Sequence, residues 1–289
     1  MSITQDFDSG CFPNWCAGCG DFGIWAAIKS ALVKLNIAPH EVTLVYGVGC
    51  HGHMVNFMHA YGFEGLYGRP VPVAVGAKIA NHTQHVIVVA GDGDTYGEGL
   101  NHLLAAMRGN HDITVIIHNN GVYGLTTGQS SPTATKGYQS KSTPEGVIET
   151  ALNPLALAVI SGATFVSRGF AGDITQLTDL IVEGINHKGF SLVDALQPCV
   201  TFNKINTYQW YREKIVKLQD LGHDFENVQE AIKIAMQDDP IATGIIYKTL
   251  KSTYESELRQ LDKGTLVTKP VSTPHNLLDN LSTGNTNAT

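Results

Sequence analysis

VIVVAGDGD, at residues 86–94, is the stretch that decides the fold: five apolar residues run directly into a turn of glycine and aspartate. A short run that is apolar throughout is expected for a strand buried on both faces of a parallel sheet. Similar runs lie at 42–46, 113–117, 163–166 and 191–195, and helix-compatible segments at 21–35, 98–108 and 173–186. This alternation predicts an α/β fold, in which a doubly wound, mostly parallel sheet carries helices on both faces.

The last part of the chain has a different character. It carries the aromatic residues Tyr208, Trp210 and Tyr211, and two helix-like segments at 227–237 and 247–261. Thr, Asn, Ser and Pro dominate from residue 262 onward, which predicts a surface tail. We therefore expect residues 1–200 to form the ligand-binding α/β domain. Residues 201–289 are expected to form a C-terminal extension that packs on this domain or on a partner subunit.

Composition excludes several functional classes. The chain has 289 residues, of which 43% are hydrophobic and 16% charged, so it can bury a sizeable core. Its formal charge of −7 argues against a nucleic-acid-binding protein. No stretch approaches the ~20 continuous apolar residues of a membrane span, and the N-terminus lacks the pattern of a signal peptide. We expect a cytoplasmic protein that does not bind membranes, whose five cysteines are ligands or buried thiols rather than disulfides.

Chemically reactive residues follow four of the five predicted strands. In open α/β sheets, ligands bind beyond the carboxyl ends of the strands, where these residues meet. The four segments are GVGCHGH at 47–53, GDGD at 91–94, HNNGVYG at 118–124 and QPC at 197–199. Although they are far apart in the chain, the topology predicts that they gather along one edge of the sheet.

Asp92 and Asn120 form a candidate magnesium and diphosphate motif. They lie 28 residues apart, which is the length of one crossover between neighbouring parallel strands. Mg²⁺ prefers oxygen ligands and takes one or two from side chains, the others coming from phosphates and water. The glycines beside Asp92 allow close approach of a diphosphate. A Gly-Asp-Gly turn alone needs no function, but the paired strand end favours the metal site.

Four of the cysteines form a second candidate site. Cys16 and Cys19 have C-x-x-C spacing in a glycine-rich turn, Cys50 follows the first strand and Cys199 follows the last. Four thiolates can bind Zn²⁺ or a [4Fe–4S] cluster, and one close pair with two remote single ligands favours the cluster. Cys50 and Cys199 could otherwise be ordinary buried thiols. Cys11 has no role in this scheme.

Gly47, Gly49 and Gly52 also form a G-x-G-x-x-G pattern after a strand, which is the spacing of dinucleotide-binding sites. The acidic residue that should follow about 20 positions later at the end of a second strand is lacking, because Glu64 lies among glycines and aromatic residues. We therefore disfavour a nicotinamide site.

Five motifs in order resemble the β subunits of 2-oxoacid:ferredoxin oxidoreductases, which are thiamine-diphosphate-dependent enzymes. These motifs are WCAGCG at 15–20, GVGC at 47–50, GDGD at 91–94, YGLTTGQ at 123–129 and PC at 198–199. The resemblance extends over roughly residues 10–260 and is greatest to the 2-oxoglutarate group. It implies thiamine diphosphate held through Mg²⁺, and a [4Fe–4S] cluster near the thiazolium ring.

The resemblance also assigns residues to these groups. It implies that Mg²⁺ is bound by Asp92, Asn120 and the main-chain oxygen of Val122, and that the cluster is held by Cys16, Cys19, Cys50 and Cys199. The cofactor-binding residues that it implies are Gly49, Gly91, Asp92, Gly93, Asp94, Asn120, Val122, Gly124, Leu125 and Thr126.

His51, His53 and Leu125 are the candidate substrate and catalytic residues. Either histidine could hydrogen-bond a 2-oxoacid or the cofactor, or simply shape its loop. Leu125 matches a position that lines the substrate pocket of the family. Tyr67 stands where the family's His-Gly-Arg-Pro stretch has histidine, so a cofactor contact from position 67 is in doubt, and Arg69 has no assigned role.

The resemblance further implies the reaction and its partners. A 2-oxoacid, with 2-oxoglutarate favoured, is decarboxylated, coenzyme A accepts the acyl group and ferredoxin accepts the electrons; the reverse carboxylation uses the same residues. The acid that activates thiamine is expected from an α or fused γα subunit, in a dimer of heterodimers. Two alternatives are a non-redox thiamine-dependent decarboxylase subunit and a zinc-stabilised nucleotide-binding module.

Overall fold

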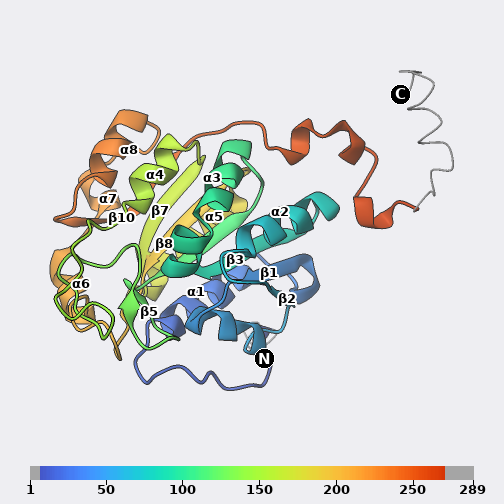
Figure 1. Cartoon of the computed structure of the whole chain (residues 1–289). Helices are drawn as coiled ribbons and strands as arrows, with labels where there is room; N and C mark the ends of the chain where they lie inside the picture. The colour runs from blue at the N-terminus through green and yellow to red at the C-terminus, as the bar shows by residue number, and fades with distance from the viewer. Residues whose placement is uncertain (1–6, 271–289) are drawn as a thin grey trace, which may run out of the picture.

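A mostly parallel eight-stranded sheet forms the centre of the structure, a computed structural model that describes residues 7–270 (Figure 1). All eight strands pair with at least one parallel neighbour, and the pairing of β10 with β7 is antiparallel. In spatial order the strands are β2 (Tyr61–Glu64), β1 (Val42–Tyr46), β3 (His85–Gly91), β4 (Thr114–Asn119), β8 (Ser191–Leu196), β7 (Phe165–Phe170), β10 (Ile241–Lys248) and β9 (Ile215–Lys217). The carboxyl ends of β1, β3, β4 and β8 therefore share one edge.

Helices cover both faces of the sheet, as the sequence predicted. One face packs against α1 (Asp21–Lys34) and α5 (Ile174–Asn186). The other packs against α2 (Pro70–Ala80), α3 (Leu100–Gly109), α4 (Pro154–Ile160) and α8 (Val228–Ala235). Neighbouring residues of one strand enter opposite cores, because side chains alternate along a strand.

The remaining elements are short. They are α6 (Tyr208–Lys214), α7 (Leu218–Leu221), the hairpin of β5 (Val122–Tyr123) and β6 (Gln129–Ser130), the π-helix η4 (Gly93–Glu98), and the 3₁₀ helices η2 (Pro39–Glu41), η3 (Cys50–Asn56), η5 (Glu255–Glu257), η6 (Arg259–Leu261) and η7 (Leu266–Thr268). Four α-helices within residues 7–270 begin with a side-chain cap, in which Asn153 accepts from Ala156 N, Asp173 from Gln176 N, Thr207 from Trp210 N, and Asn227 from Gln229 N and Glu230 N.

All five predicted strands and the predicted helices at 21–35, 173–186 and 227–237 are present, with shifted ends. The predicted helix at 98–108 begins after a turn of π-helix. The predicted helix at 247–261 is wrong: β10 continues to Lys248, and the chain then runs through two 3₁₀ turns. Backbone groups of this segment pair with other parts of the protein instead, since Thr249 N donates to Thr164 O and Tyr254 N donates to Asn110 O.

The C-terminal part adds strands β9 and β10 to the same sheet. Of the tail expected from residue 262, positions 271–289 lie outside the described residues. No helix within residues 7–270 combines the length and the apolar character that crossing a bilayer requires.

Candidate cofactor and cluster site

A cavity of about 420 Å³ lies beyond the carboxyl ends of β1, β3, β4 and β8. It is the place where the sequence predicted the reactive residues to meet. The predicted residues that line it are Gly49, Cys50, His51, Gly91, Asp92, Gly93, Asp94, Asn120, Val122, Gly124, Leu125 and Thr126. The cavity wall also includes Val48, Tyr67, Glu98, Tyr123 and Gln197, of which Tyr67 was in doubt and the others had no assigned role.

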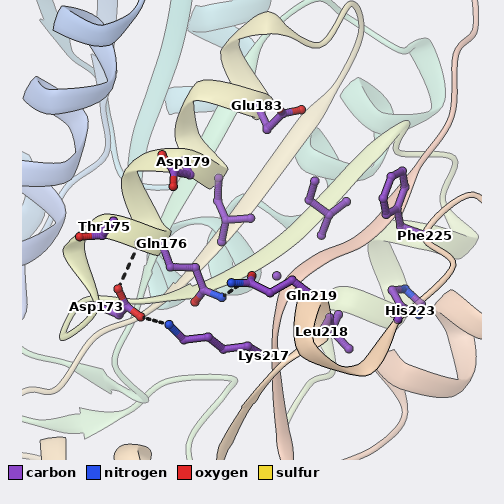
Figure 2. Close-up of a pocket in the computed structure, with 14 residues that line it drawn as sticks. Asp173, Thr175, Gln176, Asp179, Glu183, Lys217, Leu218, Gln219, His223 and Phe225 are labelled. Atoms are coloured by element: carbon purple, nitrogen blue, oxygen red, sulfur yellow. Dashed lines mark hydrogen bonds and ion pairs between the residues drawn. The ribbon is translucent and has the colours of Figure 1, made fainter.

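A second cavity, of about 380 Å³, lies between α5, α7 and β10 (Figure 2). Two pairs of its polar side chains bind each other: Asp173 Oδ2 lies 2.6 Å from Lys217 Nζ, and Gln176 Nε2 donates to Gln219 Oε1. These pairs hold α5 against the segment that carries β9 and α7. The glycine- and carboxylate-lined cavity at the strand ends is therefore the better candidate site.

Asp92 is the most heavily hydrogen-bonded group of the site. It is 2% exposed, and its Oδ2 accepts from Gly121 N, Ser131 Oγ and Thr133 Oγ1 at 2.6–2.8 Å. Burial raises the pKa of Asp92, and these hydrogen bonds oppose that rise. Among residues 7–270, Oδ1 accepts only from Gly93 N, so one of its lone pairs remains for a cation.

Asn120 completes the oxygen set. Its Nδ2 donates to Gln197 Oε1 at 2.9 Å, which turns Oδ1 away from Gln197 and toward the 120–122 loop, where Oδ1 accepts from Val122 N. The amide oxygen has a second lone pair, so Asn120 and Asp92 together present two oxygen donors from neighbouring strand ends. This donor set fits Mg²⁺ with a diphosphate.

Glycines leave room for close approach at this edge. A Cβ placed on Gly93 would lie 1.9 Å from the Tyr123 ring, and one on Gly91 would lie 2.7 Å from His51. Neither position accepts a side chain without moving a buried wall of the cavity. The tight packing agrees with a cradle in which main-chain groups meet the ligand.

Asp94 adds a second buried carboxylate. Its Oδ1 accepts from Gly68 N at 2.8 Å and from Val48 N at 3.3 Å, while Oδ2 has no hydrogen-bond partner among residues 7–270. Burial raises the pKa of Asp94 to about 6, against the effect of these two N–H donors. Asp94 thereby ties the loops after β1 and β2 to the Gly-Asp-Gly turn.

The three cysteine-bearing segments meet beside the cavity. The turn that carries Cys16 and Cys19 binds the Cys199 segment, since Gly20 N donates to Pro198 O and Gln197 Nε2 lies 3.4 Å from Cys19 Sγ. It also binds the Cys50 segment, because Trp15 Nε1 donates to Cys50 O at 2.7 Å. Burial raises the pKa of both Cys19 and Cys50, and Cys199 adds to each rise as a nearby thiol.

The segments that carry the four cysteines contact one another, and a [4Fe–4S] cluster shared by their thiols remains a prediction. In a [4Fe–4S] cluster each thiolate binds a different iron, so the sulfurs surround the cluster and do not share one ion. Within the described part of the chain, no group of three or more His, Cys, Asp or Glu side chains is arranged around one metal ion. Cys19 is buried, Cys50 and Cys199 are partly buried, and Cys16 is exposed, as is Cys11, whose backbone N donates to Ser9 Oγ.

The structure separates the three candidate substrate residues. His51 is buried in the cavity wall; burial, and then His118, lower the pKa of His51 to about 3, so its ring is neutral at physiological pH. His53 does not line the cavity, and its Nδ1 lies 3.2 Å from Asn14 Oδ1. Leu125 lines the cavity and is 48% exposed.

The structure also places Tyr67 and Arg69, whose roles the sequence left open. Tyr67 lines the cavity, and its ring centroid lies 6.4 Å from that of Tyr123. Arg69 stands at the N-cap position of α2 without capping it through its side chain, and its Nη1 donates to Gly68 O at 3.1 Å. Ser131 and Thr133, which hold Asp92, were not predicted because they lie in a polar loop without a distinctive pattern.

Family comparisons agree with this geometry. Residues 47–195 match the family of thiamine pyrophosphate enzymes, C-terminal TPP-binding domain. Residues 199–263 match the C-terminal part of the pyruvate ferredoxin oxidoreductase β subunit.

Individual relatives cover almost the whole chain. The 2-oxoacid:ferredoxin oxidoreductase β subunit of Saccharolobus solfataricus is 43% identical over 261 residues, which is 86% of each chain. A 2-oxoglutarate oxidoreductase subunit KorB of Mycobacterium tuberculosis is 39% identical over 69% of this chain and 53% of its own length. A solved structure of the 2-oxoglutarate:ferredoxin oxidoreductase of Magnetococcus marinus, with 2-oxoglutarate, coenzyme A and succinyl-CoA bound, aligns with a TM-score of 0.89 at 32% identity. That alignment covers 96% of this chain and 95% of the other.

Proposed function

This chain belongs to the family of 2-oxoacid:ferredoxin oxidoreductase β subunits, and from this premise we propose that it carries thiamine diphosphate, Mg²⁺ and one [4Fe–4S] cluster. With a partner subunit, it catalyses the coenzyme A-dependent oxidative decarboxylation of a 2-oxoacid and passes the electrons to ferredoxin. The same site serves the reverse, reductive carboxylation.

The single observation that carries the proposal is the position of Cys50. This cysteine lines the same cavity as Asp92 and Asn120, while its loop also meets the other cysteine-bearing segments. A cluster bound through Cys50 would therefore adjoin the cavity that would hold thiamine diphosphate, as electron transfer from the reaction requires. A thiamine enzyme without redox chemistry has no use for this arrangement.

Thiamine diphosphate, when bound, supplies the nucleophilic carbon and the electron sink for decarboxylation. The chain's own residues hold and shield it. Asp92, Asn120 and the main-chain oxygen of Val122 bind the Mg²⁺, and Gly93 lets the diphosphate approach the backbone. His51 is neutral and buried, so it helps to exclude water from the reacting end of the cavity.

We propose 2-oxoglutarate as the substrate. The names of the KorB relatives and the 2-oxoglutarate bound to the Magnetococcus enzyme support this choice. Leu125 lines the cavity as an apolar contact for the carbon chain. His53, half-exposed in the same 3₁₀ helix as Cys50, is the proposed contact for the second carboxylate, for which it must release Asn14.

The partner subunit completes the site. We assign the acid that activates thiamine to an α or fused γα subunit, which the β-subunit family membership implies, in a dimer of heterodimers. We further propose that the complex works in the cytoplasm, where thiols remain reduced for cluster ligation.

The test is anaerobic copurification of the chain with its α or γα subunit, followed by a screen of 2-oxoacids for viologen reduction with coenzyme A. We expect absorbance near ~400 nm and acid-labile sulfide from the cluster, and the fastest reduction with 2-oxoglutarate. A complex that decarboxylates 2-oxoacids but contains no iron would leave only a non-redox thiamine enzyme. Full activity of the isolated chain would refute the partner assignment.

A further inference from the structure

Asp21 and His118 form a buried pair directly beside a cluster ligand. His118 Nδ1 lies 2.6 Å from Asp21 Oδ1, and both side chains are 1% exposed. The other oxygen of Asp21, Oδ2, lies 3.4 Å from Cys19 Sγ. Asp21 is the first residue of α1 and His118 is in β4, so the pair also joins the cysteine-bearing turn to the central sheet.

This contact becomes a contact between like charges once iron binds. Cys19 then is a thiolate and no longer donates a hydrogen bond, so a carboxylate oxygen faces a second negative charge in a buried place. His118 offsets this repulsion by donating to the far oxygen of the carboxylate.

The pair also extends toward the cofactor cavity. The His118 ring lies 5.6 Å from the ring of His51, which forms part of the cavity wall. Cys19, Asp21, His118 and His51 therefore form a continuous buried row from the cluster ligands to the cavity. The Asp21 charge lies at the cluster end of this row, and low exposure leaves it little screened by solvent.

We propose that Asp21 and His118 are positioning residues that set the reduction potential of the cluster. The carboxylate disfavours the added electron and lowers the potential, and His118 fixes the carboxylate and limits its effect. A low potential suits an electron donor to ferredoxin, and hydrogen bonds and charges around cluster sulfurs are recognised determinants of it. This inference rests on the proposed function, because it requires the cluster.

The test is the midpoint potential of the cluster in the assembled enzyme, measured by EPR-monitored redox titration in wild type and Asp21→Asn. We expect a shift to a more positive potential in D21N at unchanged iron and sulfide content. The matched control is Glu255→Gln, which alters a second buried carboxylate–imidazole pair. Glu255 Oε1 lies 2.7 Å from His111 Nδ1, but His111 precedes β4 at its opposite end. E255Q should leave the potential at the wild-type value.

His118→Leu tests the second half of the proposal and serves if D21N does not assemble the cluster. We expect H118L alone to lower the potential, because the carboxylate loses its N–H donor. In the D21N background, H118L should add almost no shift, since His118 acts through Asp21. An unchanged potential in D21N with an intact cluster overturns the inference and leaves the proposed function in place. Wild-type complex without iron overturns both.

Discussion

Thr133 is a small residue with a large predicted effect on cofactor binding. Its Oγ1 lies 2.6 Å from Asp92 Oδ2 and 2.8 Å from Asn119 Oδ1, so it fixes the carboxylate that we propose as a metal ligand against β4. Thr133→Val keeps the shape and removes the hydroxyl. Since removing a group that orients a metal ligand typically costs ~10–100-fold in affinity, we expect a loss of that size for thiamine diphosphate with Mg²⁺, measured by calorimetry.

Thr135→Val is the control for this substitution. Thr135 lies in the same loop, but its Oγ1 contacts Asn206 rather than Asp92. Cofactor affinity in T135V should match that of wild type. Equal losses in the two variants would mean that the loop as a whole, and not the hydroxyl on Asp92, supports binding.

Serine substitutions test which cysteines bind the proposed cluster. Serine substitution of Cys16, Cys19, Cys50 or Cys199 should lower the iron and acid-labile sulfide content well below the roughly four of each per chain expected for one cluster. Cys11→Ser removes an exposed thiol that is bonded only locally through its backbone, so it should leave both contents unchanged. Iron retained in all four ligand variants would contradict the assignment.

Single residues also mark the limit of what the sequence could predict. Asp92 and Asn120 were found because the ends of parallel strands must share an edge, and that rule needs only the chain order. Ser131 and Thr133 could not be found in this way, because they reach Asp92 from a loop whose path depends on tertiary packing. His53 was grouped with His51 by proximity in sequence, yet only His51 lines the cavity.

Among the elements, the central strands were predicted correctly, whereas the helix predicted at 247–261 was wrong. The central strands are apolar throughout because both faces are buried, a signal that local sequence carries by itself. The 249–261 segment has helix-like spacing, but Asn110 Nδ2 binds its carbonyls at Lys251 and Ser252. These contacts with a distant loop outweigh the weak local preference for helix. The exposed edge strand β2 carries no such apolar signal and was missed.

Glu255 anchors this segment, and its substitution should lower stability in a pH-dependent way. It accepts from Asp112 N at 3.0 Å and lies 2.7 Å from His111 Nδ1. Burial acts to raise the pKa of Glu255, but these hydrogen bonds outweigh it and leave the pKa below its ordinary value. Because hydrogen bonds to charged groups contribute ~1.5–3 kcal/mol, we expect Glu255→Gln to lose about 1–3 kcal/mol of unfolding free energy at neutral pH.

The sign of the pH dependence follows from the lowered pKa. The advantage of wild type over E255Q is fully present above the ordinary Glu pKa of 4.5 and is lost as the pH falls through the lower folded-state pKa. Urea unfolding of both proteins at pH 7 and at several values below pH ~4.5 measures this difference. A gap that stays constant over that range would show that the carboxylate charge does not stabilise the anchor.

In the whole molecule, the cofactor cavity and the His111–Glu255 anchor lie at opposite edges of the sheet. The carboxyl ends of β1, β3, β4 and β8 form the cavity, while the anchor between His111 and Glu255 lies before the start of β4. A ligand that binds only the folded chain stabilises it by mass action. The size of this stabilisation depends on the ligand concentration and the Kd, and not on a substitution elsewhere that leaves the binding site intact. Cofactor binding and anchor strength should therefore contribute independently to stability.

This independence gives a prediction for the cofactor-depleted protein. Thiamine diphosphate with Mg²⁺ at about 100 times its Kd should add ~2.7 kcal/mol, or roughly 4–5 °C in Tm for a chain of this size. E255Q should start from a lower Tm but show the same increase, because its site is intact. Asp92→Asn should show almost no increase at that concentration, because it lacks the metal-binding carboxylate. Scanning calorimetry with and without the cofactor compares the three proteins. A reduced increase in E255Q would show that the two edges of the sheet are coupled, and that the anchor shapes the cofactor site across the length of β4.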